Sequence, residues 1–485
     1  MVPGVVRDPL PDPVIAAAVA TAAVACWWHA AVPTLAAATA MVVVLKLRGG
    51  GVVYVAAILL IVGGVATVRA ESAWDGLVPR SLGAFEGWVD LVDDPQPFGP
   101  ATRIVVRIEG ERFEIWARGR AIQRRVSTWR AGELVLMNGE RRALAPTRQQ
   151  RVSWQHVVGE FRVSWVSDVR IGTPVARASN RVRATLERGA AVLPGDDGPL
   201  FRGLVVGDDR DQPRTMIDRF RASGMSHLTA VSGQNVSFVL MAAGPLLRVM
   251  RPWWRWIVTL GLIAWFVSLT RFEPSIVRAG AMASLSATAF VMGRERAPTR
   301  ILWLAVTGLL LIDPLIIRSI GFILSVGATA GVAAIGPRLA RRLAPLGFLA
   351  MPVAITLGAQ CGVVVPAVLV FGKLPLVSIP ANLLAVPVAG FVMLYGLPAG
   401  LVAGALPSIA PVVMFPCRVG VRWVDTVALL ASRLEPGGSA TWVGWGVLVV
   451  ATGLIAARGR RVMPVMPVES ADPSARSPRG SRSLL

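Results

Sequence analysis

The polar side chains best placed for chemistry in this sequence are gathered in one short segment beside an apolar stretch. Residues 224–235 read Gly-Met-Ser-His-Leu-Thr-Ala-Val-Ser-Gly-Gln-Asn and begin the apolar stretch of residues 228–249. Hydroxyl, amide and imidazole groups are costly in hydrocarbon unless they meet water or polar partners. We therefore expect them to face an aqueous path, or to cap helix ends and hydrogen-bond to a neighbouring helix. The residues concerned are His227, Ser232, Gln234 and Asn235.

Three further polar side chains interrupt later apolar stretches, and they are Arg278, Gln360 and Asn382. An arginine near the centre of a membrane helix costs roughly 2.5–3.5 kcal/mol on insertion scales, so its presence needs a reason. Arg278 follows Pro274 by only four residues, and its long side chain could reach the membrane surface from there. If it points inward instead, its guanidinium is a binding group of the right size and charge for a phosphate.

Catalytic chemistry has little support among these residues. Ser232 and His227 lie five residues apart and could form a nucleophile and its base, but no acidic residue beside them would orient the imidazole. The three histidines and three cysteines form no CxxC, HExxH or His/Cys cluster, and no Walker A pattern occurs. We therefore expect no catalytic residue, no metal and no cofactor, and we keep an intramembrane enzyme as an alternative.

The composition indicates the class of protein that carries these side chains. Apolar residues make up 54% of the 485 residues, charged residues only 16%, and the mean hydropathy is +0.58, which excludes a soluble protein. A spanning helix needs about 20 mostly apolar residues, and about 10 to 12 such stretches can be marked. The sequence therefore predicts a polytopic α-helical membrane protein.

The net charge of +21 comes almost wholly from arginine, because Lys46 and Lys373 are the only lysines. Arginine clusters near residues 248–255, 294–300 and 338–342 recur after every second apolar stretch, as the positive-inside rule requires of cytoplasmic loops. The remaining excess leaves room for an anionic ligand such as nucleic acid or lipid headgroups.

Hydropathy and charge divide the chain into five parts. We expect N-terminal transmembrane helices over residues 1–68, a charged extracytoplasmic domain over residues 69–172, and amphipathic helices at the outer surface over residues 173–227. Residues 228–457 form the main transmembrane domain. Residues 458–485 form a basic, disordered, cytoplasmic tail.

The charged domain has the pattern of a small β-barrel. Residues 69–170 contain 16 arginines and 13 acidic residues, and their apolar side chains alternate with polar ones. Five short strands within about 90 residues fit an inserted barrel of the OB kind. In the second and third strands, one face is apolar and the other carries arginines with a tryptophan. The expected strands are residues 84–92, 101–109, 112–117, 133–137 and 157–169.

Several motifs of the chain resemble those of the ComEC family of DNA-internalisation (competence) proteins. Residues 224–233 are similar to the "aGlsHllavSG" signature, and residues 205–210 to the "lllGdr" element. Residues 274–279, Pro-Ser-Ile-Val-Arg-Ala, resemble "PSvvRA", and residues 313–314 with 321–325 resemble "DP" followed by "GFqLSf". A "Q…P…fg..P..s..aN…P" series is matched at Gln360, Pro366, Phe371, Gly372, Pro375, Ser378, Asn382 and Pro387.

These motifs follow one another in the family's order over about residues 200–390, and the resemblance implies a function. It implies a multi-pass protein of the bacterial cytoplasmic membrane that passes single-stranded DNA inward during natural transformation, with an OB-like domain outside. It also implies separate partners, namely a DNA receptor, a nuclease and a cytoplasmic ATPase motor. The oligomeric state stays open.

Such a route must be wet and lined by donors for phosphates, with few arginines, because many would hold the strand. On the barrel, the resemblance implies that arginines meet phosphates while a tryptophan stacks on a base, at about 1–3 kcal/mol per base. The residues expected along the path are Asp208, Asp209, Arg210, His227, Ser232, Gln234, Asn235, Arg278, Ser325, Gln360 and Asn382. Those expected on the barrel face are Arg103, Arg107, Arg112, Trp116 and Arg118.

The chain departs from the family pattern at three points. Asn235 stands where the family often has histidine, and Ile323 where it has glutamine. The metallo-β-lactamase-like domain of many members, with its His-x-His-x-Asp-His ligands, is absent from the sequence, so we do not expect this chain to be the nuclease. A membrane scaffold that no longer transports DNA is therefore an alternative, and the barrel could equally be a rigid spacer or an oligomer contact.

Overall fold

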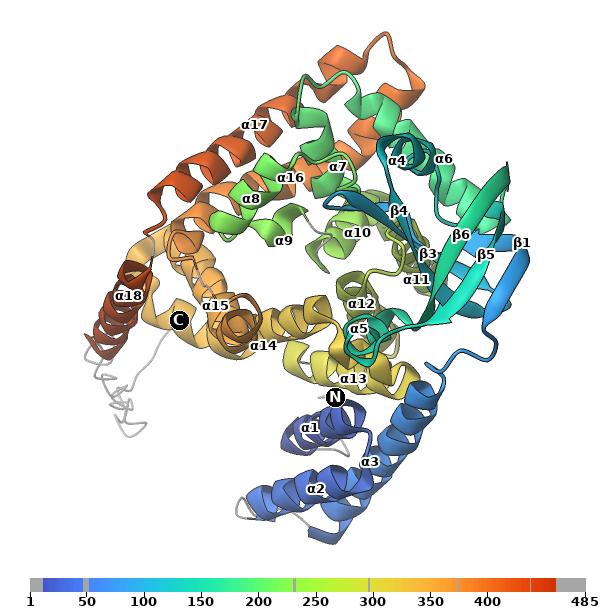
Figure 1. Cartoon of the computed structure of the whole chain (residues 1–485). Helices are drawn as coiled ribbons and strands as arrows, with labels where there is room; N and C mark the ends of the chain where they lie inside the picture. Colours follow the sequence, from blue (N-terminus) through green and yellow to red (C-terminus); the bar gives the residue numbers. More distant parts are fainter. Residues whose placement is uncertain are drawn as a thin grey trace, which may run out of the picture.

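The computed structural model describes residues 12–46, 52–229, 233–294, 297–372, 375–436 and 438–458. Within these residues the chain is mostly helical, with one six-stranded sheet near the N-terminus. Figure 1 shows the first three helices at one end of the molecule and the sheet at one side of the remaining helices. Two predictions, the role of Ser232 and the tail after Arg458, fall outside the described residues.

The first three helices pack together, and the third is longer than predicted. Their bounds are α1 Asp12–Trp28, α2 Ala31–Lys46 and α3 Val52–Asp75. We expected the membrane part to end at residue 68, before the charge of Arg69. The helix itself continues to Asp75, and the Arg69 guanidinium donates to the carbonyls of Leu311 and Ile312, at 3.1 and 2.8 Å, where another helix ends. The end of the membrane part stays a prediction.

The sheet contains all five predicted strands and one short additional strand. Its order is β1-β5-β6-β4-β3-β2, with a second pairing of two residues between β1 and β3. All neighbouring strands are antiparallel except β4 and β6. The bounds are β1 Gly83–Leu91, β2 Gln96–Phe98, β3 Ala101–Ile108, β4 Glu111–Arg118, β5 Leu134–Ala143 and β6 Val157–Arg170, with α4 Arg120–Val126, α5 Pro146–Val152 and η1 Ser153–Gln155 between them.

Both faces of β3 and β4 bury side chains. One face forms the main core of the domain, with Ile104 and Phe113 almost fully buried. The opposite face was expected to be arginine with tryptophan, but Val105 on it is also buried, against Val152 and Val157. The reason is that α5 and η1 cover part of this face, which leaves only its ends open to solvent.

The rest of the chain is helical. Four short helices lead from the sheet to the membrane part: α6 Pro174–Ala190, α7 Asp197–Val206, α8 Arg214–Ala222 and α9 Ser226–Thr229. In Figure 1, α6 lies between the sheet and α16, and α9 and α10 lie toward the middle of the helices. The later helices are α10 Gly233–Arg248, α11 Pro252–Leu269, α12 Pro274–Val291, α13 Pro298–Ile312, η2 Pro314–Arg318, α14 Ile320–Arg342, η3 Ala344–Leu349, α15 Ala350–Phe371, α16 Ser378–Ala405, α17 Ala410–Leu434 and α18 Ser439–Arg458.

Five helices of the described residues are long and apolar enough to cross a membrane. They fall in α3, α11, α14, α15 with η3, and α16, and shorter apolar helices accompany them. Most of their side chains lie open to the surroundings rather than buried in the protein, as expected of helices in lipid. The chain is therefore a multi-pass membrane protein, and a total of 10 to 12 spans stays a prediction.

Helices α14 and α15 pack closely enough to require glycine. A Cβ atom added to Gly331 would lie 2.1 Å from the carbonyl oxygen of Gly358, and one added to Gly362 would lie 2.0 Å from that of Gly327. Small residues allow such approach, and packing contacts replace the hydrophobic effect between helices in lipid. This pair forms one side of the helical part.

We predict that Gly331→Val lowers the stability of the protein by about 1–3 kcal/mol, because the added carbon atoms collide with the α15 backbone. Thermal unfolding of the purified protein in detergent measures the change. Gly308→Val in α13 is the matched control, since a Cβ atom there meets nothing within 4 Å. Equal melting temperatures for the two variants would contradict the close packing of α14 on α15.

Candidate functional site

Arg278 is a buried guanidinium with neutral partners. It lies in the second turn of α12 and is 5% exposed. Its Nε donates to Ser325 Oγ on α14 at 2.9 Å, and its Nη1 lies 3.0 Å from Met282 Sδ. Among the described residues, no carboxylate forms an ion pair with it. A buried charge without a counter-charge is costly, and it remains available to an anionic ligand.

The start of α10 touches this guanidinium. A Cβ atom at Gly233 would lie 2.8 Å from Arg278 Nη2, so the backbone at Gly233 lies close to this guanidinium. The predicted residues Arg278 and Ser325 are brought together, and Gly233 of the polar segment lies against Arg278.

The other end of the polar segment contacts a second polar group. Gln360 Nε2 donates to Ser378 Oγ at 2.9 Å, linking α15 to the first residue of α16. A Cβ atom at Gly224 would lie 2.6 Å from Ser378 Cβ, so the chain just before α9 packs on this pair. Asn382 follows one turn later, is 7% exposed, and has an Oδ1 atom without a hydrogen-bond partner among the described residues.

The residues between these two groups differ in accessibility. Ser226, His227 and Gln234 are exposed, although their helices lie toward the middle of the molecule in Figure 1. Asn235 is 2% exposed, and its Nδ2 donates to the carbonyls of Leu204 and Val205 at 3.1 and 3.4 Å. These carbonyls belong to the last turn of α7, which has no helical partner for them. Asn235 thus caps the end of α7. Helix capping is the alternative to an aqueous path that we gave for this residue.

A second site, missed in the sequence, joins the sheet domain to the helices. Asp94 follows β1, is 8% exposed, and pairs with Arg183 of α6 at 3.0 Å and with Arg271, just after α11, at 3.1 Å. His156, next to η1, lies 3.1 Å from the Oδ2 atom of Asp313, next to η2. The contacting residues are far apart in sequence, so periodicity gave no signal for them.

Asp208 and Arg210, predicted on the path, belong to this junction. Asp208 is 3% exposed and pairs with Arg210 at 2.6 Å, and it lies 3.7 Å from Arg183. Burial raises the pKa of Asp208, and the charges of Arg183 and Arg202 offset part of that rise. Among the described residues, no ion pair or hydrogen bond joins Asp208 or Arg210 to Arg278 or to Gln360. Their link to the polar segment is indirect, through the bonds of Asn235 to the end of α7.

The predicted arginines of the sheet share one face, since Arg103 is opposite Trp116 and Arg107 is opposite Arg112. These arginines differ in whether other groups of the domain already bind their guanidinium groups. Arg103 pairs with the buried Glu114 at 2.9 Å, and Arg112 donates to the Gln155 carbonyl at 2.8 Å. Trp116 contacts Phe98 edge-on and lies under Arg148. Arg107 and Arg118 are exposed.

Three carboxylates, Asp93, Asp209 and Glu273, lie close enough at the junction to repel one another. Burial, and then the charges of Asp93 and Asp209, raise the pKa of Glu273 to about 7. Burial and the charge of Asp208 also raise the pKa of Asp209. Glu273 and Asp209 are nevertheless accessible to solvent. Solvent access together with a raised pKa is expected of carboxylates in a recess within the protein. No group of three or more possible metal ligands occurs in the described part of the chain.

Comparison with known proteins places the polar segment within a known family region. Residues 204–461, more than half of the chain, match the family model described as Competence protein. The chain is 28% identical over 251 residues to ComE operon protein 3 of Bacillus subtilis (strain 168), a match that covers 50% of this chain and 30% of the relative's length. No solved structure matches the chain. The matched region contains Arg278, Gln360 and Asn382, whereas the sheet domain precedes it.

We predict that Glu273→Gln stabilises the protein much more at pH 8 than at pH 5. An acid whose folded pKa lies above its usual 4.5 binds more protons when folded, so its destabilising effect is absent below about pH 4.5 and complete above about pH 7. Melting temperatures from pH 5 to 8 measure the effect. Glu71→Gln on α3 removes the same charge away from the junction. An equal pH dependence of the two variants would contradict the grouping of Asp93, Asp209 and Glu273.

Proposed function

Because the chain belongs to the competence protein family, whose members take part in DNA uptake, we propose that it conducts single-stranded DNA across the cytoplasmic membrane during natural transformation. The observation that carries this proposal is Arg278. Its buried guanidinium has hydroxyl and thioether partners but no carboxylate among the described residues. It lies against the glycine that begins α10, so a phosphate reaching the polar segment would meet it.

The surrounding groups suit a strand that must move. Ser325, Gln360, Ser378 and Asn382 offer neutral donors and acceptors, and neutral groups bind phosphates weakly. Conduction needs several weak sites instead of one tight site. A single guanidinium among neutral groups meets that condition, because it attracts the polyanion without holding it along its length.

We infer the orientation from charge. The arginine clusters near residues 248–255 and 338–342 would face the cytoplasm under the positive-inside rule, and the sheet domain would then lie outside the cell. The tail of residues 458–485 would lie in the cytoplasm. A motor, a nuclease and a DNA receptor would be separate proteins.

We also propose that the sheet domain is a partly open barrel of the OB kind that binds the strand. The pairing of β1 with both β5 and β3 supports this architecture. Because Arg103 and Arg112 are already bonded within the domain, Arg107 and Arg118 would make the phosphate contacts.

We predict that Arg278→Glu abolishes uptake of labelled DNA while the protein remains in the membrane. Two like charges about 4 Å apart repel by about 4 kcal/mol at an effective dielectric constant of about 20, which corresponds to a roughly 1000-fold reduction. Arg278→Lys keeps the charge and should retain partial uptake. Arg338→Glu, at an exposed position of α14, is the control. Normal transformation by Arg278→Glu would exclude this role.

The sheet domain can be tested in the full chain embedded in nanodiscs. We predict that Arg107→Ala with Arg118→Ala weakens binding of a single strand and lowers the slope of log affinity against log salt by about 0.7 per lost phosphate contact. Arg103→Ala would instead lower thermal stability, because Glu114 would lose a buried partner. Unchanged affinity and slope in the double variant would make the domain a spacer.

A further inference from the structure

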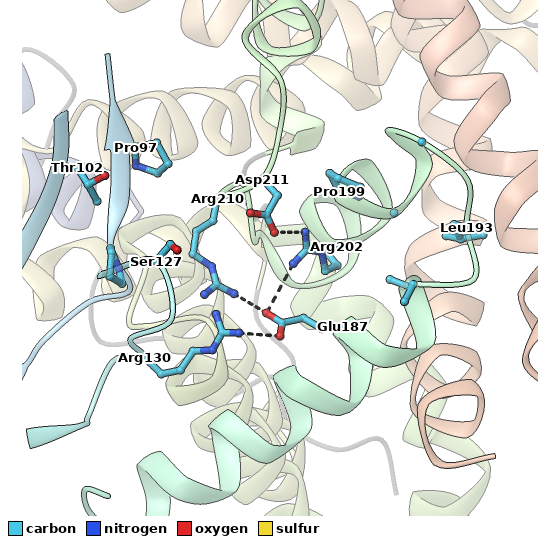
Figure 2. A pocket seen from close by; sticks show the side chains of 15 residues that line it. Pro97, Thr102, Ser127, Arg130, Glu187, Leu193, Pro199, Arg202, Arg210 and Asp211 are labelled. Atoms are coloured by element: carbon cyan, nitrogen blue, oxygen red, sulfur yellow. Dashed lines mark hydrogen bonds and ion pairs between the residues drawn. The ribbon is translucent and has the colours of Figure 1, made fainter. Parts of the chain in front are cut away.

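A cavity of about 440 Å³ lies between the sheet domain and the hairpin of α6 and α7. Its walls come from the loop after β1, the segment after α4, the end of α6, the start of α7 and the loop after α7. Figure 2 shows Arg130, Arg202 and Arg210 pointing toward Glu187, with Asp211 beside Arg202. The size is that of a site for a small molecule or a single nucleotide unit.

Arg202 is the arginine of this group that contacts the exposed carboxylate, Asp211. Its side chain is 11% exposed, and within the described residues its one hydrogen bond goes to Asp211 Oδ2, at 2.5 Å. Glu187 and Asp208 lie farther from it, at 3.6 and 3.5 Å. A guanidinium has five N–H donors, so Arg202 can donate several more bonds.

Asp211 is a carboxylate that a ligand can replace. Its side chain is 64% exposed, whereas the arginine that it contacts is nearly buried. Asp211 stays solvated when the pair separates, whereas the nearly buried Arg202 then needs another anion. A phosphate oxygen arriving from solvent would form the same charge-assisted bond in place of the carboxylate.

The other two arginines are fixed around the same point. Arg130 and Arg210 each donate to Glu187 at 2.7 Å, so both guanidinium groups are held at the cavity wall before any ligand arrives. Three arginines against Glu187 and Asp211 give the lining a charge of +1, and Asp208, which pairs with Arg202 and Arg210 from outside the lining, brings the group to zero. The charge would become +1 if Asp211 moved away. Pro97 and Pro199 add apolar surface on which a sugar or base can lie.

We propose that this cavity is a subsite for one phosphodiester unit of the incoming single strand, in which the phosphate takes the place of Asp211 on Arg202. The inference rests on the proposed function and adds a second contact point outside the polar segment. A membrane lipid would present a similar phosphate, but all lining residues lie between Pro95 and Asp211 and none belongs to α11, α14, α15 or α16. The cavity therefore has no wall for an acyl chain in those spans.

The test measures binding of a fluorescent oligo-dT strand to the full chain in detergent, by anisotropy at several salt concentrations. Asp211→Asn removes the competing carboxylate, so we expect affinity to rise about fivefold and the salt slope to steepen by about 0.7. Asp218→Asn is the matched control, because it makes the same charge change at an exposed residue of α8 that pairs only with its neighbour Arg221 among the described residues. Arg202→Gln should weaken binding about tenfold.

Each outcome decides one point. A tighter and more salt-sensitive Asp211→Asn variant beside an unchanged Asp218→Asn variant would establish the subsite even if Arg202→Gln failed to fold. Equal affinities of the two aspartate variants would overturn it and leave the proposed function intact, since wild-type binding would persist. If a short-chain phosphatidylglycerol bound Asp211→Asn more tightly than the wild-type chain and the strand did not, the cavity would be a lipid site. That result would overturn the inference. A wild-type chain that binds no strand would contradict the proposed function itself.

Discussion

A guanidinium buried away from water needs a partner for its charge, and this chain provides partners of two kinds. At the junction of the sheet domain with the helices, Arg183 and Arg271 share the carboxylate of Asp94, and removing one member of such a group leaves an uncompensated buried charge. In α12, the partners of Arg278 among the described residues are a hydroxyl and a thioether. The first arrangement fixes two parts of the protein relative to each other, whereas the second leaves a cation able to bind an anion.

The same difference distinguishes, elsewhere in the molecule, arginines that stabilise the fold from arginines that can bind a ligand. On the sheet, Glu114 accepts bonds from Arg103 and Arg148, and although burial acts to raise its pKa, these bonds outweigh burial and lower it. Such arginines stabilise the domain and have little capacity for phosphate. The exposed Arg107 and Arg118, together with Arg202 beside its exposed partner Asp211, are the cations proposed to meet an external polyanion. Counting arginines on a face therefore overestimates how many of them can bind a nucleic acid.

Local pattern explains which parts of the fold could be predicted. Alternation gave the starts of the five predicted strands to within one residue, because one face of each is buried, although β5 continues six residues beyond its predicted end. The bonds of Arg69 to carbonyls at the end of α13, more than 240 residues away, gave no signal in the sequence. Asp94, Arg183 and Asp208 could not be grouped for the same reason. Arg278 was found because an arginine in an apolar helix is costly wherever the chain folds.

The two proposed contact points for the strand are joined by one short helix. Arg202 lies in α7, and two and three residues later the carbonyls of Leu204 and Val205 accept bonds from Asn235. Asn235 lies two residues after Gly233, which touches Arg278. Asn235 thus links the helix that carries Arg202 to the start of α10, beside Arg278. Because α7 is only 10 residues long, about 15 Å, the chain of contacts between the cavity and the buried guanidinium passes through one short helix.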